Sequence, residues 1–173
     1  MRRKPYTIFV FLALFAHAAP TWAQENLLAI GPMAGAVVRP EQSTLGLLGG
    51  ELTFTHYEGS GAFKDGFGGF LQASTVGFER ARFAFGPQAN YSLFGAEVGA
   101  VFDTAAPGQS ACVGVHLAPF VSTGFVAVSI QTDIPVAPLS EGPLPRWSVT
   151  FAVTHKLPVD VSRGLRFPWQ WDE

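Results

Sequence analysis

Eight short segments of alternating side-chain character make up most of the chain after residue 24, and they restrict the fold more than any other feature. Clusters of Gly, Pro, Asn, Asp and Ser separate them. Successive side chains of a β-strand point to opposite faces, so this alternation predicts strands, and no helical 3.6-residue stripe competes with it. The predicted strands run approximately over 26–38, 44–57, 65–78, 80–91, 94–104, 111–121, 124–134 and 146–157.

Each predicted strand has one bulky apolar face and one face of small or polar residues. In the segment 124–133, Val126, Val128 and Ile130 share one face, and Ser129 lies on the other. The second face of the strands consists mostly of Gly, Ala, Ser and Thr, with a few charged residues. No long linker or composition shift interrupts the strands, so we expect one continuous β-domain.

The small side chains indicate which face points inward. The interior of a narrow eight-stranded barrel holds little side-chain volume, so small polar residues fit inside and bulky apolar residues fit outside, against lipid. A soluble barrel or sandwich would expose the Gly- and Ala-rich face in a chain that has only 14% charged residues. The sequence predicts an all-β, antiparallel up-and-down barrel with these lipid-facing residues: Phe83, Phe85, Val98, Phe102, Val126, Val128, Ile130 and Phe151.

Matching the faces across two tight turns predicts the register of two hairpins. A slip of one residue would move every side chain to the opposite face, so each match is specific. With a turn at 92–93, the facing pairs are Gln88 with Glu97, Phe85 with Ala100, Phe83 with Phe102, and Arg82 with Asp103. With a turn at 122–123, they are Leu117 with Val128, Val115 with Ile130, His116 with Ser129, and Gly114 with Gln131.

The beginning of the chain has the pattern of a cleavable signal peptide. Three basic residues in the first four precede an apolar run, which ends in small residues near Ala23. We predict a signal peptide over 1–23, a barrel domain over 24–157 and a C-terminal tail over 158–173. A second cleavage position after Ala18 stays open, and so does an uncleaved anchor.

The signal peptide, the mature length and the eight alternating strands together resemble the small outer-membrane β-barrel proteins of Gram-negative bacteria. The resemblance implies a location in the cell outer membrane, with membrane lipid and the outer-membrane insertion machinery as partners. The alternative location is the periplasm. Members of this class commonly end in a strand with a terminal aromatic residue. Here the strand at 146–157 is followed by a tail in which Leu165, Phe167, Trp169 and Trp171 alternate, so the tail is an alternative position for the last strand.

The predicted inward face carries charged residues that have to be partnered. A carboxylate in a narrow lumen loses hydration and is tolerated only when it is paired or hydrogen-bonded. The first hairpin register places Arg82 opposite Asp103, and the alternative is that this pair lies in water at the rim. We predict an interior polar network of these residues: Glu51, Arg82, Gln88, Glu97, Asp103 and His116.

No catalytic, cofactor-binding or metal-binding residue is predicted. His56, His116 and His155 have no metal-ligand spacing, and Cys112 is the only cysteine, so it forms no intramolecular disulfide. His116 beside Ser129 is more simply a hydrogen-bonded interior pair, because the sequence places no carboxylate to orient the ring. There is no G-x-S-x-G motif, and the Gly-rich stretch 66–70 is not followed by the residues of a phosphate loop.

The expected function is that of a non-enzymatic outer-membrane barrel with a structural, adhesive or surface-interaction role. Without Arg2, Arg3 and Lys4 the chain has 8 basic and 13 acidic residues, a net charge of −5, so nucleic acid is not an expected partner. No motif identifies a surface ligand. Two alternatives stay open: a soluble periplasmic barrel that binds a small hydrophobic ligand, and a lipid-modifying outer-membrane enzyme.

Overall fold

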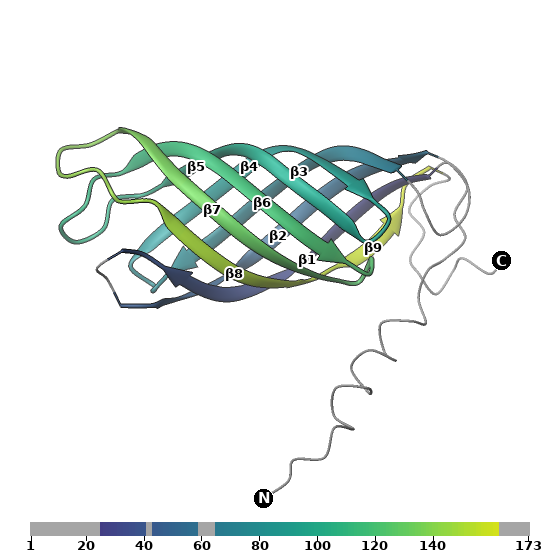
Figure 1. The fold of residues 1–173 in the computed structure, drawn as a ribbon, viewed down its shortest axis with the longest axis horizontal. Helices are drawn as coiled ribbons and strands as arrows, with labels where there is room; N and C mark the ends of the chain where they lie inside the picture. The colour runs from purple at the N-terminus through teal and green to yellow at the C-terminus, as the bar shows by residue number, and fades with distance from the viewer. Residues whose placement is uncertain (1–24, 41–42, 59–64, 163–173) are drawn as a thin grey trace, which may run out of the picture.

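The protein forms a long, closed β-barrel whose strands are strongly tilted around its axis (Figure 1). The computed structural model describes residues 25–40, 43–58 and 65–162. The predicted signal peptide at 1–23 and the tail residues 163–173 lie outside the described residues. The strands are β1 (Glu25–Val38), β2 (Leu45–Glu58), β3 (Asp65–Val76), β4 (Arg80–Tyr91), β5 (Phe94–Asp103), β6 (Cys112–Ser122), β7 (Val126–Pro138), β8 (Ser148–His155) and β9 (Leu157–Asp160).

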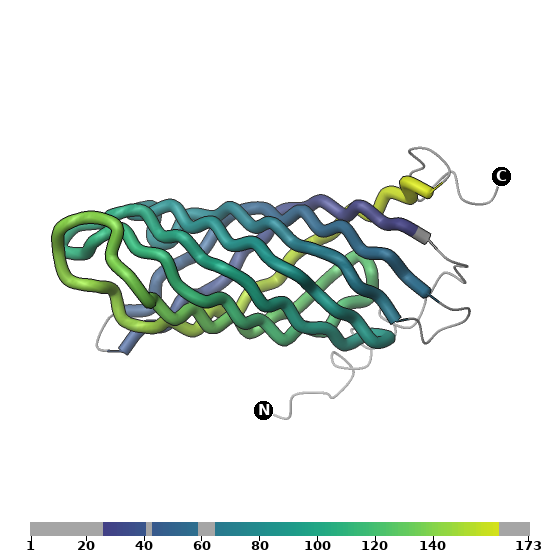
Figure 2. Tube along the Cα trace, turned by 90° about the horizontal axis from the view of Figure 1, so that it is seen from above, coloured from purple at the N-terminus to yellow at the C-terminus, as the bar shows by residue number. Residues whose placement is uncertain are grey.

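The sheet closes because β1 pairs with strands on both sides. Every strand from β1 to β7 pairs antiparallel with the next one, and β1 also pairs with β8. Strand β9 then pairs with β1 in the register that β8 began, so β8 and β9 share the eighth position of the barrel. Figure 2 shows the resulting cylinder from a second direction. The prediction of an antiparallel barrel of about eight strands is confirmed.

The strand that closes the barrel lies in the region predicted for the last strand. Strand β8 pairs with β7 on one side and with β1 on the other. Pairing continues through β9, which faces Leu27–Ile30 and extends three residues past the predicted domain boundary at 157. The alternating residues Leu165 to Trp171 of the tail lie outside the described residues.

Prolines explain three interruptions of the strand ladders. Pro32 lies in β1 opposite the break between β8 and β9. Pro87 lies where the β4–β5 pairing is interrupted, and Pro119 lies at a similar gap between β6 and β7. Because proline has no N–H group, it cannot donate a hydrogen bond to a ladder. The ladder is therefore interrupted near each proline. Beyond each gap it resumes in the same register, because no residue is inserted or lost there.

The first predicted hairpin register is confirmed and the second is wrong. Strands β4 and β5 pair as predicted across Ser92 and Leu93. Between β6 and β7 the true register is shifted by four residues, so His116 faces Asp133 rather than Ser129. The connection is a three-residue loop over 123–125, in which Gly124 adopts a φ of +90° that favours glycine. An even shift leaves both faces unchanged.

The connections divide the barrel into two ends. We call the end that carries the connections after β1, β3, β5 and β7 the loop end; it lies at the left of Figure 1. The other end, the terminal end, carries the turns at 92–93 and 123–125, the start of β1 and the end of β9. At the loop end, Ser110 N and Oγ both donate to Pro143 O at 3.1 Å. The loops at 104–111 and 139–147 are therefore held against each other.

Inward-facing glycines let neighbouring strands approach closely. A Cβ at Gly68 of β3 would lie 1.8 Å from the carbonyl oxygen of Phe54 on β2. The adjacent outward-facing Gly69 is different, because a Cβ there would come no nearer than 3.4 Å to the oxygen of Gly86. The glycine-rich stretch at 66–70 thus serves close strand packing.

We expect Gly68→Ala to lower the free energy of unfolding by about 1–3 kcal/mol, because the backbone of β2 has to move away from the new methyl group. Gly69→Ala is the matched control and should change stability by less than about 1 kcal/mol. Denaturant titration of both variants measures the difference. Equal stability of the two would contradict the close approach of β2 and β3 at Gly68.

Candidate functional site

The six residues predicted for the interior network all lie inside the barrel. Each is at most 5% exposed, and Arg82 and Asp103 are buried rather than at a wetted rim. The rim alternative for this pair is therefore wrong. Two small apolar clusters occupy other parts of the interior, one around Met33 and Val37 and one around Phe70.

Arg82 organises the half of the interior nearer the loop end. Its Nε donates to Asp103 Oδ1 at 2.8 Å, and its Nη2 donates to Asp103 Oδ2 at 3.1 Å, so the two side chains form a bidentate pair. Its Nη1 donates to Asp133 Oδ2 at 2.6 Å. Because Asp133 is on β7 and Arg82 is on β4, this last bond crosses the lumen.

His116 lies at the middle of the network between two carboxylates. Its Nδ1 donates to Asp133 Oδ1 at 2.7 Å, and its Nε2 lies 3.7 Å from Glu97 Oε2. The ring of Phe70 packs against it with the centroids 5.3 Å apart. The expectation that no carboxylate orients this ring is thus wrong, because the shifted β6–β7 register brings Asp133 to it. Ser129 instead accepts a hydrogen bond from Gln131.

Glu51 anchors the half of the interior nearer the terminal end. Gln72 Nε2 donates to Glu51 Oε2 at 3.2 Å and to Glu97 Oε2 at 2.9 Å, so it links the two carboxylates. Lys156 Nζ forms an ion pair with Glu51 Oε1, and Thr154 Oγ1 donates to Glu51 Oε2 at 3.2 Å. Glu51 thus receives contacts from both β3 and the closing strand.

Together these contacts form one continuous chain through the barrel, which we call the interior polar chain. It places four carboxylates among four cations and one histidine, so each buried charge has an opposite charge nearby. Gln88 is not part of it: this side chain donates to Thr55 Oγ1, although its backbone faces Glu97 as predicted. The members in order are Lys156, Glu51, Gln72, Glu97, His116, Asp133, Arg82, Asp103, and Arg80 with Arg39.

Sequence reasoning missed five members of this chain: Gln72, Asp133, Lys156, Arg80 and Arg39. The alternation of side chains along the strands could have identified three of them. Arg80 shares the inward face of β4 with the predicted Arg82, and Asp133 shares the inward face of β7 with Ser129 and Gln131. Lys156 continues the inward face of β8 beyond Thr154. A charged residue at an inward position is therefore the pattern that finds them.

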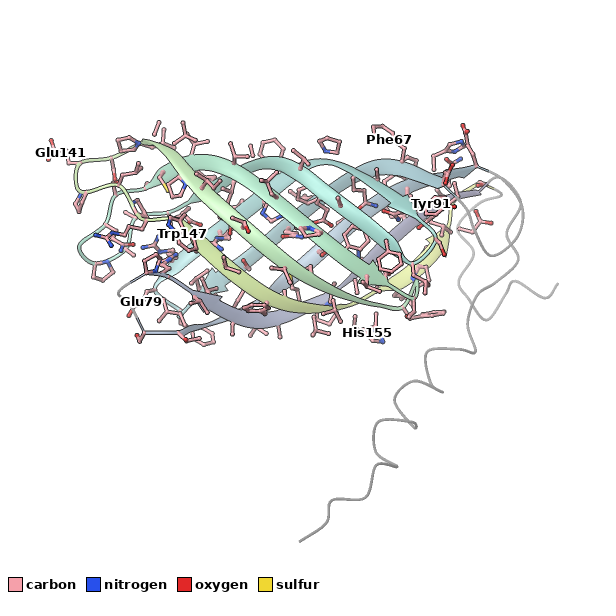
Figure 3. The ribbon with its side chains drawn as sticks, in the orientation of Figure 1. Phe67, Glu79, Tyr91, Glu141, Trp147 and His155 are labelled. Carbon is pink, nitrogen blue, oxygen red and sulfur yellow. The ribbon has the colours of Figure 1, made fainter. Side chains whose placement is uncertain are left out.

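The outer face of the barrel is apolar on every strand from β1 to β8. Of the eight residues predicted to face lipid, six are 42–54% exposed, while Phe102 and Val126 are partly covered. In Figure 3, Phe67 and Tyr91 lie near the terminal end, Trp147 lies nearer the loop end, and all three are more than half exposed.

Exposed charges avoid the middle of this outer face. Among the described residues they are Glu58 and Asp65 at strand ends, Glu79 in a turn, and Glu141 and Arg146 in a loop. Glu79 and Glu141 lie at the loop end in Figure 3. The barrel thus has charges inside, apolar side chains around its middle, and charges again at its two ends.

The remaining candidate groups offer little for catalysis. Cys112 is a buried free thiol. The exposed His56 forms a hydrogen bond of 2.8 Å between its Nδ1 and Asn26 Oδ1. Within residues 25–40, 43–58 and 65–162, no group of three or more His, Cys, Asp or Glu side chains is arranged to hold a metal ion. In the same residues, no helix has the length and apolar character to cross a membrane.

Comparisons of this chain with models of protein families, with curated proteins and with solved structures found no match.

Proposed function

We propose that this chain is a β-barrel of the bacterial cell outer membrane, with a structural, adhesive or surface-interaction role and no catalytic activity. One observation carries the proposal: large apolar side chains are exposed around the whole circumference, while the charged side chains of the described residues lie inside or at the two ends. Exposed apolar patches of more than a few hundred Å² are rare on soluble monomers. A surrounding bilayer removes this cost, because lipid covers the apolar belt of a membrane barrel.

The polar interior argues against the soluble alternative. A periplasmic barrel that binds a hydrophobic ligand needs an apolar cavity. In this barrel, Asp133 instead links Arg82 to His116, which lies beside Glu97, across the centre of the interior. Side chains from opposite strands are bonded to one another across the lumen. We infer that the interior polar chain plugs the barrel and stiffens it.

The loop end is the part of the barrel proposed to contact the cell exterior. An even number of strands puts both termini on one side, and membrane barrels of this kind keep that side and its short turns in the periplasm. The loops at 104–111 and 139–147 then face outward. Their mutual hydrogen bonds hold them in a fixed arrangement, which suits a recognition surface.

The lipid-modifying alternative makes a separate prediction. Asp133 orients His116 as a catalytic carboxylate would. The Nε2 atom of His116, however, lies 3.7 Å from Glu97 Oε2 and has no hydrogen-bond partner within the described residues, so no hydroxyl nucleophile is bonded to it there. An enzyme of this kind would change the mass of membrane lipids on overexpression, and His116→Ala would abolish the change.

Fractionation tests the proposed location. We expect the full chain, expressed in a Gram-negative host, to be found in the outer-membrane fraction and to migrate faster on a gel before heating than after it. A variant that lacks residues 1–23 is the control and should remain in the cytoplasm. Recovery of the full chain in osmotic-shock fluid, without a heat-dependent shift in mobility, would overturn the proposal.

A further inference from the structure

A cavity of about 240 Å³ opens at the loop end of the barrel. Its walls come from three connections, those between β1 and β2, β3 and β4, and β5 and β6. A single water molecule occupies about 30 Å³ in the liquid, so the cavity has room for a small polyatomic group. The polar lining residues are Arg39, Ser43, Glu79, Arg80 and Gln109.

Beside this cavity, Arg39, Arg80 and Arg82 all pair with the buried Asp103, while the exposed Glu79 is a further carboxylate in the lining. Arg82 occupies both oxygens of Asp103, while Arg80 Nη1 and Arg39 Nη2 lie 3.5 Å and 3.9 Å from Asp103 Oδ2. Asp133, the other carboxylate of Arg82, is shared with His116. Three guanidinium groups thus depend on two carboxylates that already have other partners.

Arg39 has the weakest set of partners among the three. Its side chain is only 4% exposed, and its ion pair with Asp103 is the longest at 3.9 Å. Within the part of the chain that the structure describes, its Nε has no hydrogen-bond partner. A buried guanidinium with an unsatisfied N–H group is costly. An anion in the cavity that Arg39 lines would place an opposite charge beside this guanidinium.

The electrostatic surroundings of Arg39 agree with this arrangement. Burial, followed by the positive charges of Arg80 and Arg82, lowers the pKa of Arg39 to about 10. The side chain is still cationic at neutral pH, since this pKa lies well above 7. An anion would thus meet a charged Arg39 and would also offset its repulsion from Arg80.

We propose that this cavity binds a phosphate group, with Arg39 and Arg80 as cationic partners and the Ser43 hydroxyl as a neutral donor. Planar guanidinium groups match phosphate oxygens in pairs, and donors from the β1–β2 connection and from the start of β4 suit a group that has several equivalent oxygens. The proposal depends only on the barrel and its loops, so it goes beyond the proposed membrane function and stands apart from it.

Hydrogen bonds within the barrel hold the side of the cavity formed by Arg80 and the β5–β6 loop. Arg80 Nη2 donates to Gln109 Oε1, and Ala106 and Gln109 exchange two backbone hydrogen bonds of 3.2 Å and 2.9 Å. A site with fixed walls loses less conformational entropy on binding. Glu79 adds a carboxylate to the lining, which repels a second negative charge on a ligand.

Calorimetric titration of the purified barrel with inorganic phosphate, in uncharged detergent micelles, tests the site. We expect saturable binding, which Arg39→Gln and Ser43→Glu should each weaken about ten-fold or more, because the first removes a charged donor and the second replaces a neutral donor with a carboxylate that repels phosphate. Ser43→Glu keeps every arginine, so it separates loss of binding from loss of folding. Glu79→Gln should strengthen binding, and Arg146→Gln, which removes an exposed charge at the same end, should leave it unchanged.

A second experiment, with the barrel in lipid nanodiscs, distinguishes a lipid headgroup from a soluble phosphate ester as the source of the phosphate group. Parent protein in nanodiscs that contain phosphatidic acid should retain this lipid through Arg39 if the ligand is a lipid headgroup, even when inorganic phosphate binds weakly. Binding of inorganic phosphate alone indicates a soluble phosphate ester instead. The proposal is overturned if neither probe binds, if Arg39→Gln or Ser43→Glu binds like the parent, or if Arg146→Gln loses binding to the same extent.

Discussion

Replacing Arg82 with Met is expected to lower the free energy of unfolding by about 3–5 kcal/mol, because it leaves buried carboxylates without their main partner. Asp103 would keep only its longer contacts to Arg80 and Arg39, and Asp133 would keep only His116. Met has a similar reach without the charge, so the change removes the interaction and little packing. Urea titration in lipid vesicles measures the loss.

The double variant Arg82→Met with Asp103→Leu separates this network from an isolated pair. Removing both members of an isolated buried pair is often nearly neutral. Here Asp133, Arg80 and Arg39 remain without their shared partners, so the double variant should stay clearly less stable than the parent. The coupling energy between the two sites should be about 0.5–3 kcal/mol.

The exposed carboxylate of Glu79 provides the control for the double-mutant cycle on Arg82 and Asp103. Glu79→Gln changes one charge in the turn between β3 and β4 and should alter stability by less than about 0.5 kcal/mol. A coupling energy of zero between Arg82 and Asp103, or a double variant as stable as the parent, would contradict a continuous interior polar chain.

Most of the fold could be predicted because alternation is a local property of the sequence. The bounds of β4 and the turn at 92–93 follow from side-chain parity and from turn residues alone. Strand β7 is an exception, since it extends to Pro138 rather than ending near Ile134. The prolines of this segment look like a strand end, but Pro135 lies at a bulge opposite Gly114, where a missing N–H group is tolerated.

The interior contacts were predictable only in part, because they depend on register and on closure of the sheet. Parity alone shows that Arg82 and His116 point inward. It does not show that Asp133 lies between them, since that follows from a loop that Gly124 shapes. The link from Lys156 to Glu51 depends on β8 and β9 pairing with β1, and these residues are far apart along the chain.

A charge on the outer face should be costly in proportion to its depth in the bilayer. Val98 on β5 and Val136 on β7 are 50% and 64% exposed, so replacing either with Arg removes little packing. Val98 lies in the middle of β5 (Phe94–Asp103), whereas Val136 lies two residues from the end of β7, at the loop end. In lipid, Val98→Arg should cost about 2–4 kcal/mol and Val136→Arg only about 0–1 kcal/mol.

This comparison tests most directly the claim that lipid surrounds the barrel. Reversible unfolding of the parent and both variants in lipid vesicles gives the two costs for the same residue type at two depths. The account predicts that Val98→Arg is the more destabilising by at least about 1 kcal/mol. Equal costs at the two positions, as expected for two water-exposed valines, would contradict it.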